Sequence, residues 1–215
     1  DIKLAYLPNP IVGVRLRLST YGGVKDEEIR RIDTEFEKLR EMLGDAIYGE
    51  GEDTLQIVIG KHLKNKGMTL SAAESCTGGK IASLLTSVAG ASQYFYGSVT
   101  SYDNSIKENI LGVPHEIIAQ HGAVSRECVE AMAKGVNRIM NTDFAVATSG
   151  IAGPGGGTPE KPVGTAWLAV AYRDRKSGRE EVISKKVAFN SSREVNIDRF
   201  ASNALNLLRL YLESH

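Results

Sequence analysis

The stretch MTLSAAESCTGGKIASLLTSV, residues 68–88, indicates the fold class of most of this chain. Its first seven residues have the apolar character of a short buried strand, and a helix is predicted to begin near Thr77. The turn between them carries Ser, Cys and Thr in succession and then two glycines. Strand-like and helix-like segments continue to alternate after this stretch. That alternation is typical of an α/β fold in which helices cover both faces of a sheet.

The other elements are predicted from the same periodicities. Alternating or continuous apolar runs indicate strands, and apolar residues at three- and four-residue spacing indicate helices. We expect strands at residues 2–8, 12–19, 68–74, 98–102, 144–150, 163–172 and 181–190. We expect helices at residues 25–43, 54–67, 77–88, 125–140 and 192–212, with Ser125 capping the fourth. His115 and His121 stand in loop-like contexts.

Residues 1–50 read as a small α+β unit of their own. Two β-rich runs precede an amphipathic helix, and the polar segment GEGED at residues 49–53 marks a boundary. We therefore expect one domain at residues 1–50 and a second at residues 53–215. The chain opens with Asp1 and enters a strand almost at once, which indicates a fragment of a longer protein.

The composition argues against several classes of protein. Among 215 residues, 26 Lys and Arg balance 26 Asp and Glu, so the basic excess of proteins that bind nucleic acids or membrane surfaces is missing. No apolar run approaches the ~20 residues of a membrane span. Cys76 and Cys128 lack the paired spacing of a zinc site. Reduced thiols in a cytoplasmic enzyme are the simpler interpretation, although a disulfide stays open.

Ser75 is the first candidate for chemistry. It stands at the carboxyl end of the predicted strand, the edge at which open α/β sheets bind ligands. Free N–H groups at the start of the next helix, with Gly78 and Gly79, would let an anion or a carbonyl oxygen approach the main chain. The stretch is not a phosphate-binding P-loop, because Glu74 replaces its first glycine and Ile81 replaces the Ser or Thr after its lysine. A corner that uses glycine only for tight packing is the alternative, and both interpretations stay open.

Lys107, in the segment SYDNSIKENILG, is the candidate general base. The sequence offers no convincing Ser, His and Asp set, and a lysine whose pKa is lowered by desolvation can take the place of the histidine. Tyr102 ends the preceding strand, about one helical turn earlier. The alternative is that Lys107 is one more solvated helix lysine.

The segment TSGIAGPGGGTPEKPVGTAW, residues 148–167, joins two predicted strands through a loop rich in Gly and Pro. Such a loop either surrounds a ligand with main-chain donors or is simply a long hairpin. The run from Gly150 to Gly153 matches the GXXG loop of RNA-binding KH modules, but it lacks the basic residues that would hold a phosphate backbone.

In this order and spacing, AESCTGG, VTSYDNSIK, LGV, QHGAVS and ATSGIAGPGGGTPEKPVGTAW resemble the CinA carboxy-terminal domain family. The resemblance covers residues 53 to about 213 and implies a three-layer α/β/α sandwich around a mixed sheet. Residues 1 to about 50, with LAYLP and GVRLRL, look like the KH-type middle domain of full-length CinA. The family's activity is hydrolysis of nicotinamide mononucleotide to nicotinate mononucleotide and ammonia, a step of pyridine nucleotide recycling. It implies no metal and no organic cofactor.

The resemblance also implies roles for individual residues. The family's catalytic residues fall here on Ser75, the nucleophile, on Lys107, and on Tyr102, the Tyr that opens the second motif. That motif reads YDNSIK here, so Asp103, Ser105 and Ile106 depart from the family's YSNEAK-like pattern. We expect substrate contacts from Thr77, Gly78, Gly79, Ser149, Gly150, Ile151, Ala152, Gly153 and Arg193. For the phosphate of the substrate, Arg193 and Arg199 are both candidates. Main-chain N–H groups near Thr77 and Gly78 are the expected oxyanion donors.

Other interpretations remain beside this one. Cys76 is a second candidate nucleophile, but adjacent strand residues point to opposite faces, so we expect only one of Ser75 and Cys76 to face the ligand and assign Cys76 to packing. The chain is alternatively a nucleic-acid-binding module, which its zero net charge disfavours, or a catalytically silent scaffold. We expect a homo-oligomer without membrane or nucleic-acid partners.

Overall fold

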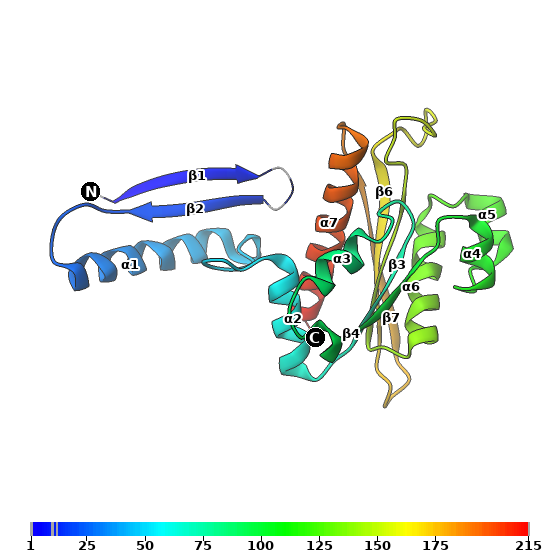
Figure 1. The fold of residues 1–215 in the computed structure, drawn as a ribbon, viewed down its shortest axis with the longest axis horizontal. Coiled ribbons are helices and arrows are strands. Elements are labelled where there is room, and N and C mark those ends of the chain that lie inside the picture. The colour runs from blue at the N-terminus through cyan, green and yellow to red at the C-terminus, as the bar shows by residue number, and fades with distance from the viewer. Residues whose placement is uncertain (1, 10, 12, 215) are drawn as a thin grey trace. The chain divides into compact units, whose positions relative to one another are not determined.

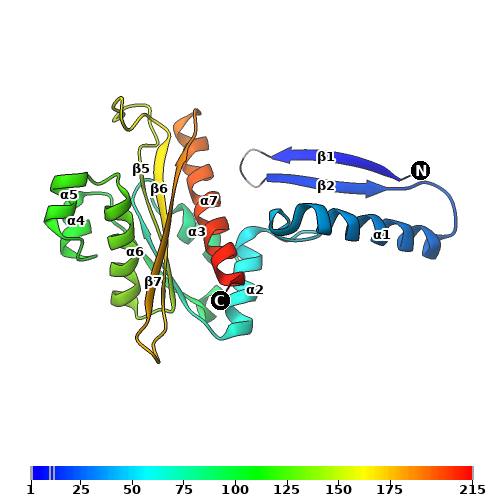
Figure 2. The ribbon, with the colours of Figure 1, turned by 180° about the vertical axis from the view of Figure 1, so that it is seen from behind.

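The division between the two structural units of the chain falls just after the polar segment GEGED. One unit ends at Thr54 and the other begins at Leu55. The structure, a computed structural model, describes residues 2–9, 11 and 13–214 (Figures 1 and 2). Asp1 and His215, the outer bounds of the two predicted domains, and Val12, the start of a predicted strand, lie outside the described residues.

The first unit consists of a β-hairpin and one long helix. Its elements are β1 (Lys3–Asn9), β2 (Gly13–Ser19), α1 (Lys25–Leu43) and the short 3₁₀ helix η1 (Gly44–Ala46). The antiparallel register pairs Leu4 with Leu18 and Tyr6 with Leu16, which places apolar side chains on one face of the hairpin. Both strands and the long helix were predicted from the sequence, and the described residues confirm them. The KH-type assignment stays a prediction.

The second unit is built on a mixed five-stranded sheet. In spatial order its strands are β4 (Phe95–Thr100), β3 (Leu70–Glu74), β5 (Phe144–Gly150), β6 (Thr165–Arg173) and β7 (Glu180–Ala188). β3 runs parallel to both β4 and β5, whereas β6 is antiparallel to β5 and to β7. All five residues of β3 are buried, as predicted for this strand, although Ser71 and Glu74 are polar.

Helices cover both faces of this sheet and make it the middle of three layers (Figures 1 and 2). On one face lie α2 (Leu55–Lys66), α3 (Lys80–Thr86) and α7 (Arg193–Glu213). On the other lies α6 (Arg126–Met140), with α4 (Asn104–Asn109) and α5 (His115–His121) beside it. The predicted α/β sandwich around a mixed sheet is confirmed.

The core beneath α6 shows why this sequence forms these layers. Val129, Met132, Ala133 and Val136 recur at the spacing of one helix face and are completely buried. They pack against small side chains of the sheet, namely Ala73, Ala145, Ala147, Ala169 and Ala171. The predicted cap is present as well, because Ser125 Oγ accepts the N–H of Cys128 at 3.2 Å. Within the described residues, no helix combines the length and the apolarity needed to cross a lipid bilayer.

Several details of the predicted elements were wrong. β4 ends at Thr100, two residues before Tyr102, which was predicted to end it. α3 begins at Lys80 instead of near Thr77, because Gly78 and Gly79 have φ angles of 59° and 100° and keep the turn out of helical geometry. His115 and His121, predicted to lie in loops, begin and end α5. A helix of seven residues is too short for an apolar repeat to reveal it.

Candidate active site

A cavity of about 200 Å³ lies where the carboxyl ends of β3, β4 and β5 meet. Because these three strands are parallel, the residues that follow them emerge at one edge of the sheet. The predicted site residues that line the cavity are Ser75, Tyr102, Lys107, Ser149, Gly150, Ala152 and Arg193. Segments far apart in the sequence therefore contribute to one polar site.

Ser75 is the first residue after β3, and its main chain is fixed by both neighbouring strands. Its N–H donates to the carbonyl oxygen of Thr148 on β5 at 3.0 Å. The carbonyl oxygen of the preceding residue, Glu74, accepts the N–H of Ser101 at 2.8 Å, just after β4. Ser75 therefore lines the cavity from a well-anchored position.

Lys107, on α4, is 1% exposed although it carries an amine. Its Nζ donates to two main-chain carbonyl oxygens, that of Ser101 at 2.7 Å and that of Tyr102 at 3.2 Å. Burial lowers the pKa of Lys107, and the neighbouring Cys128, Asp103 and Cys76 only partly oppose this shift. No ion pair joins Lys107 to a carboxylate in the described part of the chain. The alternative of a solvated surface lysine is wrong.

Cys76 also contributes to the cavity, so the expectation that only one of Ser75 and Cys76 would face it is wrong. The alternation of a strand no longer applies there, because β3 ends at Glu74. Both Cys76 and Cys128 are buried free thiols. Burial raises the pKa of the Cys76 thiol to about 12, which keeps it protonated at neutral pH. A thiol in that state is a poor nucleophile.

Arg193, the first residue of α7, links two loops at the cavity. Its Nη1 donates to the carbonyl oxygen of Gly153 at 2.7 Å, and its Nη2 donates to the hydroxyl of Tyr102 at 2.9 Å. Both partners are uncharged, and no carboxylate forms an ion pair with Arg193 among the described residues. A guanidinium with only uncharged partners is chemically able to bind an anion.

The loop after β5 is held by close contacts on either side. Ser149 Oγ donates to the carbonyl oxygen of Ala123 at 2.7 Å. The carbonyl oxygen of Ala152 accepts a bond from Asn196 Nδ2 at 3.0 Å. At Gly150 a side chain has no room, because an added Cβ would lie 2.5 Å from Ala166 Cβ. The first residues of the TSGIAGP segment are therefore tightly packed where they line the cavity.

The other predicted binding residues, Thr77, Gly78, Gly79, Ile151 and Gly153, do not line the cavity. Thr77 Oγ1 shares a hydrogen bond of 2.7 Å with Thr148 Oγ1. The N–H groups of Gly78 and Gly79 already donate to the carbonyl oxygen of Ser75 and to the carboxylate of Glu74. Ile151 continues the pairing with β6, since its N–H donates to Thr165 at 2.8 Å. Contacts from these residues to a ligand stay predictions.

Three further residues line the cavity without having been assigned to it, namely Asn104, Ala123 and Val124. Each lies inside a motif that carries the family resemblance, VTSYDNSIK or QHGAVS, so the signal was present in the sequence. Among residues 2–9, 11 and 13–214, no group of three or more His, Cys, Asp or Glu side chains is arranged to hold a metal ion.

The fold and the cavity define an α/β protein with a polar site at the carboxyl edge of a mixed sheet. Residues 52–212 match the family model described as the CinA C-terminal domain, and the chain belongs to the CinA family. It is 39% identical over 212 residues to a CinA-like protein of Thermotoga maritima and 44% identical over 209 residues to one of Salinibacter ruber. These matches cover 99% and 97% of this chain but 49% of each relative. The chain thus spans about half the length of the curated relatives it matches.

Solved structures share the fold. The competence/damage inducible protein CihA from Agrobacterium tumefaciens matches with a TM-score of 0.69 at 38% identity, over 74% of this chain and 93% of that one. A competence-damaged protein (CinA) superfamily protein from Escherichia coli gives a TM-score of 0.66 at 26% identity, over 78% of this chain and 98% of that one.

Proposed function

We propose that the second unit hydrolyses a carboxamide and that its substrate is nicotinamide mononucleotide, which gives nicotinate mononucleotide and ammonia. The observation that carries this proposal is the buried Lys107 amine, with its lowered pKa, in the same cavity as Ser75. A serine hydroxyl needs a base to become a nucleophile, and a desolvated lysine is one of the groups that can serve.

The reaction follows from these two groups. Ser75 Oγ attacks the carboxamide carbon while Lys107 takes the hydroxyl proton. The tetrahedral intermediate collapses to an ester of Ser75, and Lys107 returns the proton to the departing ammonia. Water then hydrolyses the ester, which releases the carboxylate and restores the serine. Main-chain N–H groups near Thr77 stay the proposed donors to the oxyanion, at ~3 kcal/mol for each donor. The N–H of Gly78 is not one of them, because it already donates to the carbonyl oxygen of Ser75.

Arg193 and the loop after β5 support the proposed substrate class. A mononucleotide carries a phosphate, and a guanidinium with only uncharged partners favours such an anion. Tyr102 is 62% exposed, and its hydroxyl already accepts a bond from Arg193. We assign it to orienting this arginine and the ligand. The main chain from Ser149 to Gly153 forms the proposed wall beside the nucleotide.

The proposal is tested by incubating the purified chain with nicotinamide mononucleotide and measuring ammonia and nicotinate mononucleotide together. Both products should form in equal amounts with wild-type protein and should be absent with Ser75→Ala. Binding of single-stranded nucleic acid is measured in parallel over a range of salt concentrations. Tight, salt-dependent binding without product would favour the nucleic-acid-binding alternative.

A further inference from the structure

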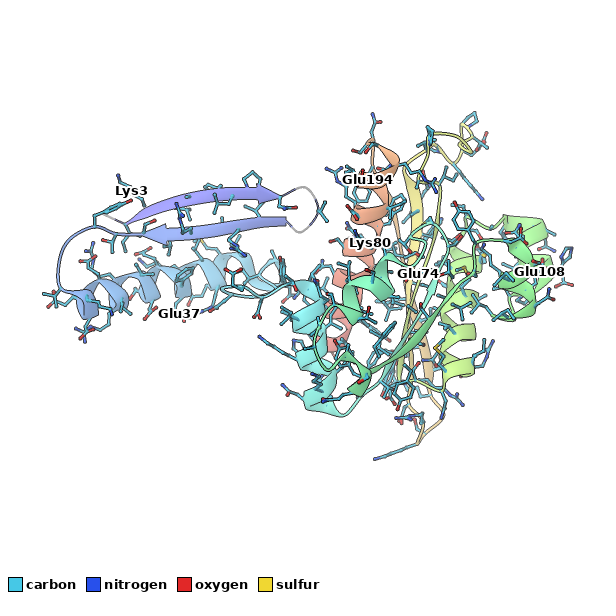
Figure 3. All side chains as sticks on the ribbon, in the orientation of Figure 1. Lys3, Glu37, Glu74, Lys80, Glu108 and Glu194 are labelled. Atoms are coloured by element: carbon cyan, nitrogen blue, oxygen red, sulfur yellow. The ribbon has the colours of Figure 1, made fainter. Side chains whose placement is uncertain are left out.

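Glu74, labelled in Figure 3, is a completely buried carboxylate one residue before Ser75. It does not line the cavity. No ion pair neutralises it among the described residues. The neighbouring Lys80 instead pairs with Asp198 at 2.6 Å. A buried charge is costly unless hydrogen bonds compensate it, so the partners of Glu74 indicate its role.

Those partners are main-chain N–H groups at the start of α3. Oε2 of Glu74 accepts from Gly79 at 3.1 Å and from Ile81 at 3.0 Å, and Oε1 accepts from Ala82 at 2.9 Å. Such groups have no carbonyl partner within a helix. The residue that should cap α3 is Gly79, which has no side chain and has a φ of 100°. Glu74 supplies the missing cap from five residues earlier.

The main chain of Glu74 is fixed at the opposite end of the same turn. Its carbonyl oxygen accepts a hydrogen bond from the N–H of Ser101. The N–H of the next residue, Ser75, donates to the carbonyl oxygen of Thr148. Glu74 therefore fixes the turn that carries Ser75 on both sides. Its main chain is hydrogen-bonded within the sheet, and its carboxylate is hydrogen-bonded to the first N–H groups of α3.

We propose that Glu74 is the positioning residue for Ser75, because it ties the start of α3 to the end of β3 and so fixes the serine hydroxyl at the cavity. The proposal rests on the proposed function, in which Ser75 is the nucleophile. It also means that the start of α3 already holds the carboxylate of the chain itself, so the anion of the substrate depends on Arg193 instead. A misplacement of about 1 Å in a reacting group costs about 100-fold in rate, which sets the size of the expected effect.

The test compares Glu74→Gln and Glu74→Asp with Asp198→Asn in the full chain. Gln keeps the shape but presents an NH₂ group to main-chain donors, whereas Asp keeps the charge and is shorter by one methylene. Asp198→Asn is the matched control, since Asp198 contacts the same helix through Lys80 but does not hold the turn. Each protein is assayed for kcat and KM with nicotinamide mononucleotide, for thermal unfolding, and for the rate at which a fluorophosphonate labels Ser75, read by peptide mass.

Glu74→Gln should lower both kcat and the labelling rate by about 100-fold, with KM changed by less than about threefold. Glu74→Asp should lie between Gln and wild type, and Asp198→Asn should stay near wild type. Wild-type labelling rates in both Glu74 variants would overturn the proposal. A raised KM at unchanged kcat would overturn it too and make Glu74 a ligand contact. If Asp198→Asn lowers kcat and the labelling rate as much as the Glu74 variants do, the proposal is overturned and Glu74 only stabilises α3.

The labelling experiment separates this inference from the proposed substrate. A wild-type chain that is labelled at Ser75 but releases no ammonia refutes the substrate, and the labelling rates still decide the role of Glu74. If Ser75 is not labelled, both proposals fall. If neither Glu74 variant folds, amide hydrogen exchange of the wild-type protein tests the proposed contacts of Glu74 instead. The amides of Gly79, Ile81 and Ala82 should be protected, and rapid exchange would overturn the proposal.

Discussion

The amine of Lys107 lies 2.7 Å from the carbonyl oxygen of Ser101, to which it donates a hydrogen bond. Ser101 in turn donates its N–H to Glu74, so the candidate base is anchored to the strand that presents Ser75. The second bond, to Tyr102, occupies another amine hydrogen. A neutral amine has two hydrogens and one lone pair. If Lys107 is neutral, both of its amine hydrogens are donated to carbonyl oxygens. Its lone pair is then available to accept the proton of the Ser75 hydroxyl.

Ser75→Ala should abolish deamidation without unfolding the protein, because it removes only the attacking oxygen. Cys76→Ala should keep most of the activity, since a thiol with a pKa of about 12 supplies almost no thiolate at neutral pH. Ammonia release and thermal unfolding measure both variants. Activity lost in the Cys76 variant but retained in the Ser75 variant would reverse the assignment of the nucleophile.

Arg193→Lys should raise KM for nicotinamide mononucleotide by about tenfold or more, because lysine keeps the charge but lacks the planar fork. KM for nicotinamide riboside, which has no phosphate, should change much less. Arg199→Lys is the matched control on the same helix. Its guanidinium stacks 5.4 Å from the ring centre of Phe189, and it does not line the cavity. Equal effects of Arg193→Lys on both substrates would contradict the phosphate contact.

Gly150→Ala should destabilise the second unit by about 1–3 kcal/mol, because the new Cβ would overpack against Ala166 and Thr165. Gly155→Ala in the same loop should change the free energy of unfolding by less than about 0.5 kcal/mol, since a Cβ there meets nothing within 4 Å. Urea denaturation followed by the fluorescence of the single tryptophan, Trp167 on β6, reports on this unit. Equal stability of the two variants would refute the packing argument.

A chain that begins at Asp53 should keep kcat/KM within about threefold of the full chain. Every residue that lines the cavity falls between Ser75 and Arg193. The CihA structure is also matched over 93% of its own length by 74% of this chain. Steady-state kinetics of the two proteins provide the comparison. Insoluble protein or lost turnover would show that the first unit supports the second.

Much of the site was predictable because local patterns placed residues at strand ends. The apolar character of the run before Ser75 predicted a buried strand, and open α/β sheets bind ligands at the carboxyl ends of their strands. Ser75 could therefore be assigned to the ligand-binding edge of the sheet, whereas Ser149 was assigned from the family resemblance. Lys107 was predicted from the shortage of suitable histidines and from the family resemblance, and the structure places it in the same cavity.

The remaining features depend on contacts that no short pattern records. Glu74 caps a helix from outside it, which matches no standard capping sequence, so its role became visible only with the turn in place. The start of α3 at Lys80 instead of near Thr77 was likewise not predictable, because it depends on the positive φ angles of Gly78 and Gly79. Ala123 and Val124 reach the cavity because the segment between α5 and α6 folds back to Ser149.

The pH dependence of kcat/KM, measured for wild type beside Lys107→Arg, is the most direct test of a Ser75–Lys107 amidohydrolase. Burial lowers the pKa of Lys107 below its ordinary 10.5, so the neutral, active form should dominate above that lowered pKa and be lost as the pH falls through it. We predict a rate of nicotinate mononucleotide formation that rises with pH through a single ionisation below 10.5 in the wild type. Lys107→Arg should be nearly inactive at every pH, because a guanidinium keeps its proton. Near-normal turnover by Lys107→Arg, or a wild-type rate that shows no such ionisation, would contradict the role of Lys107 as the base.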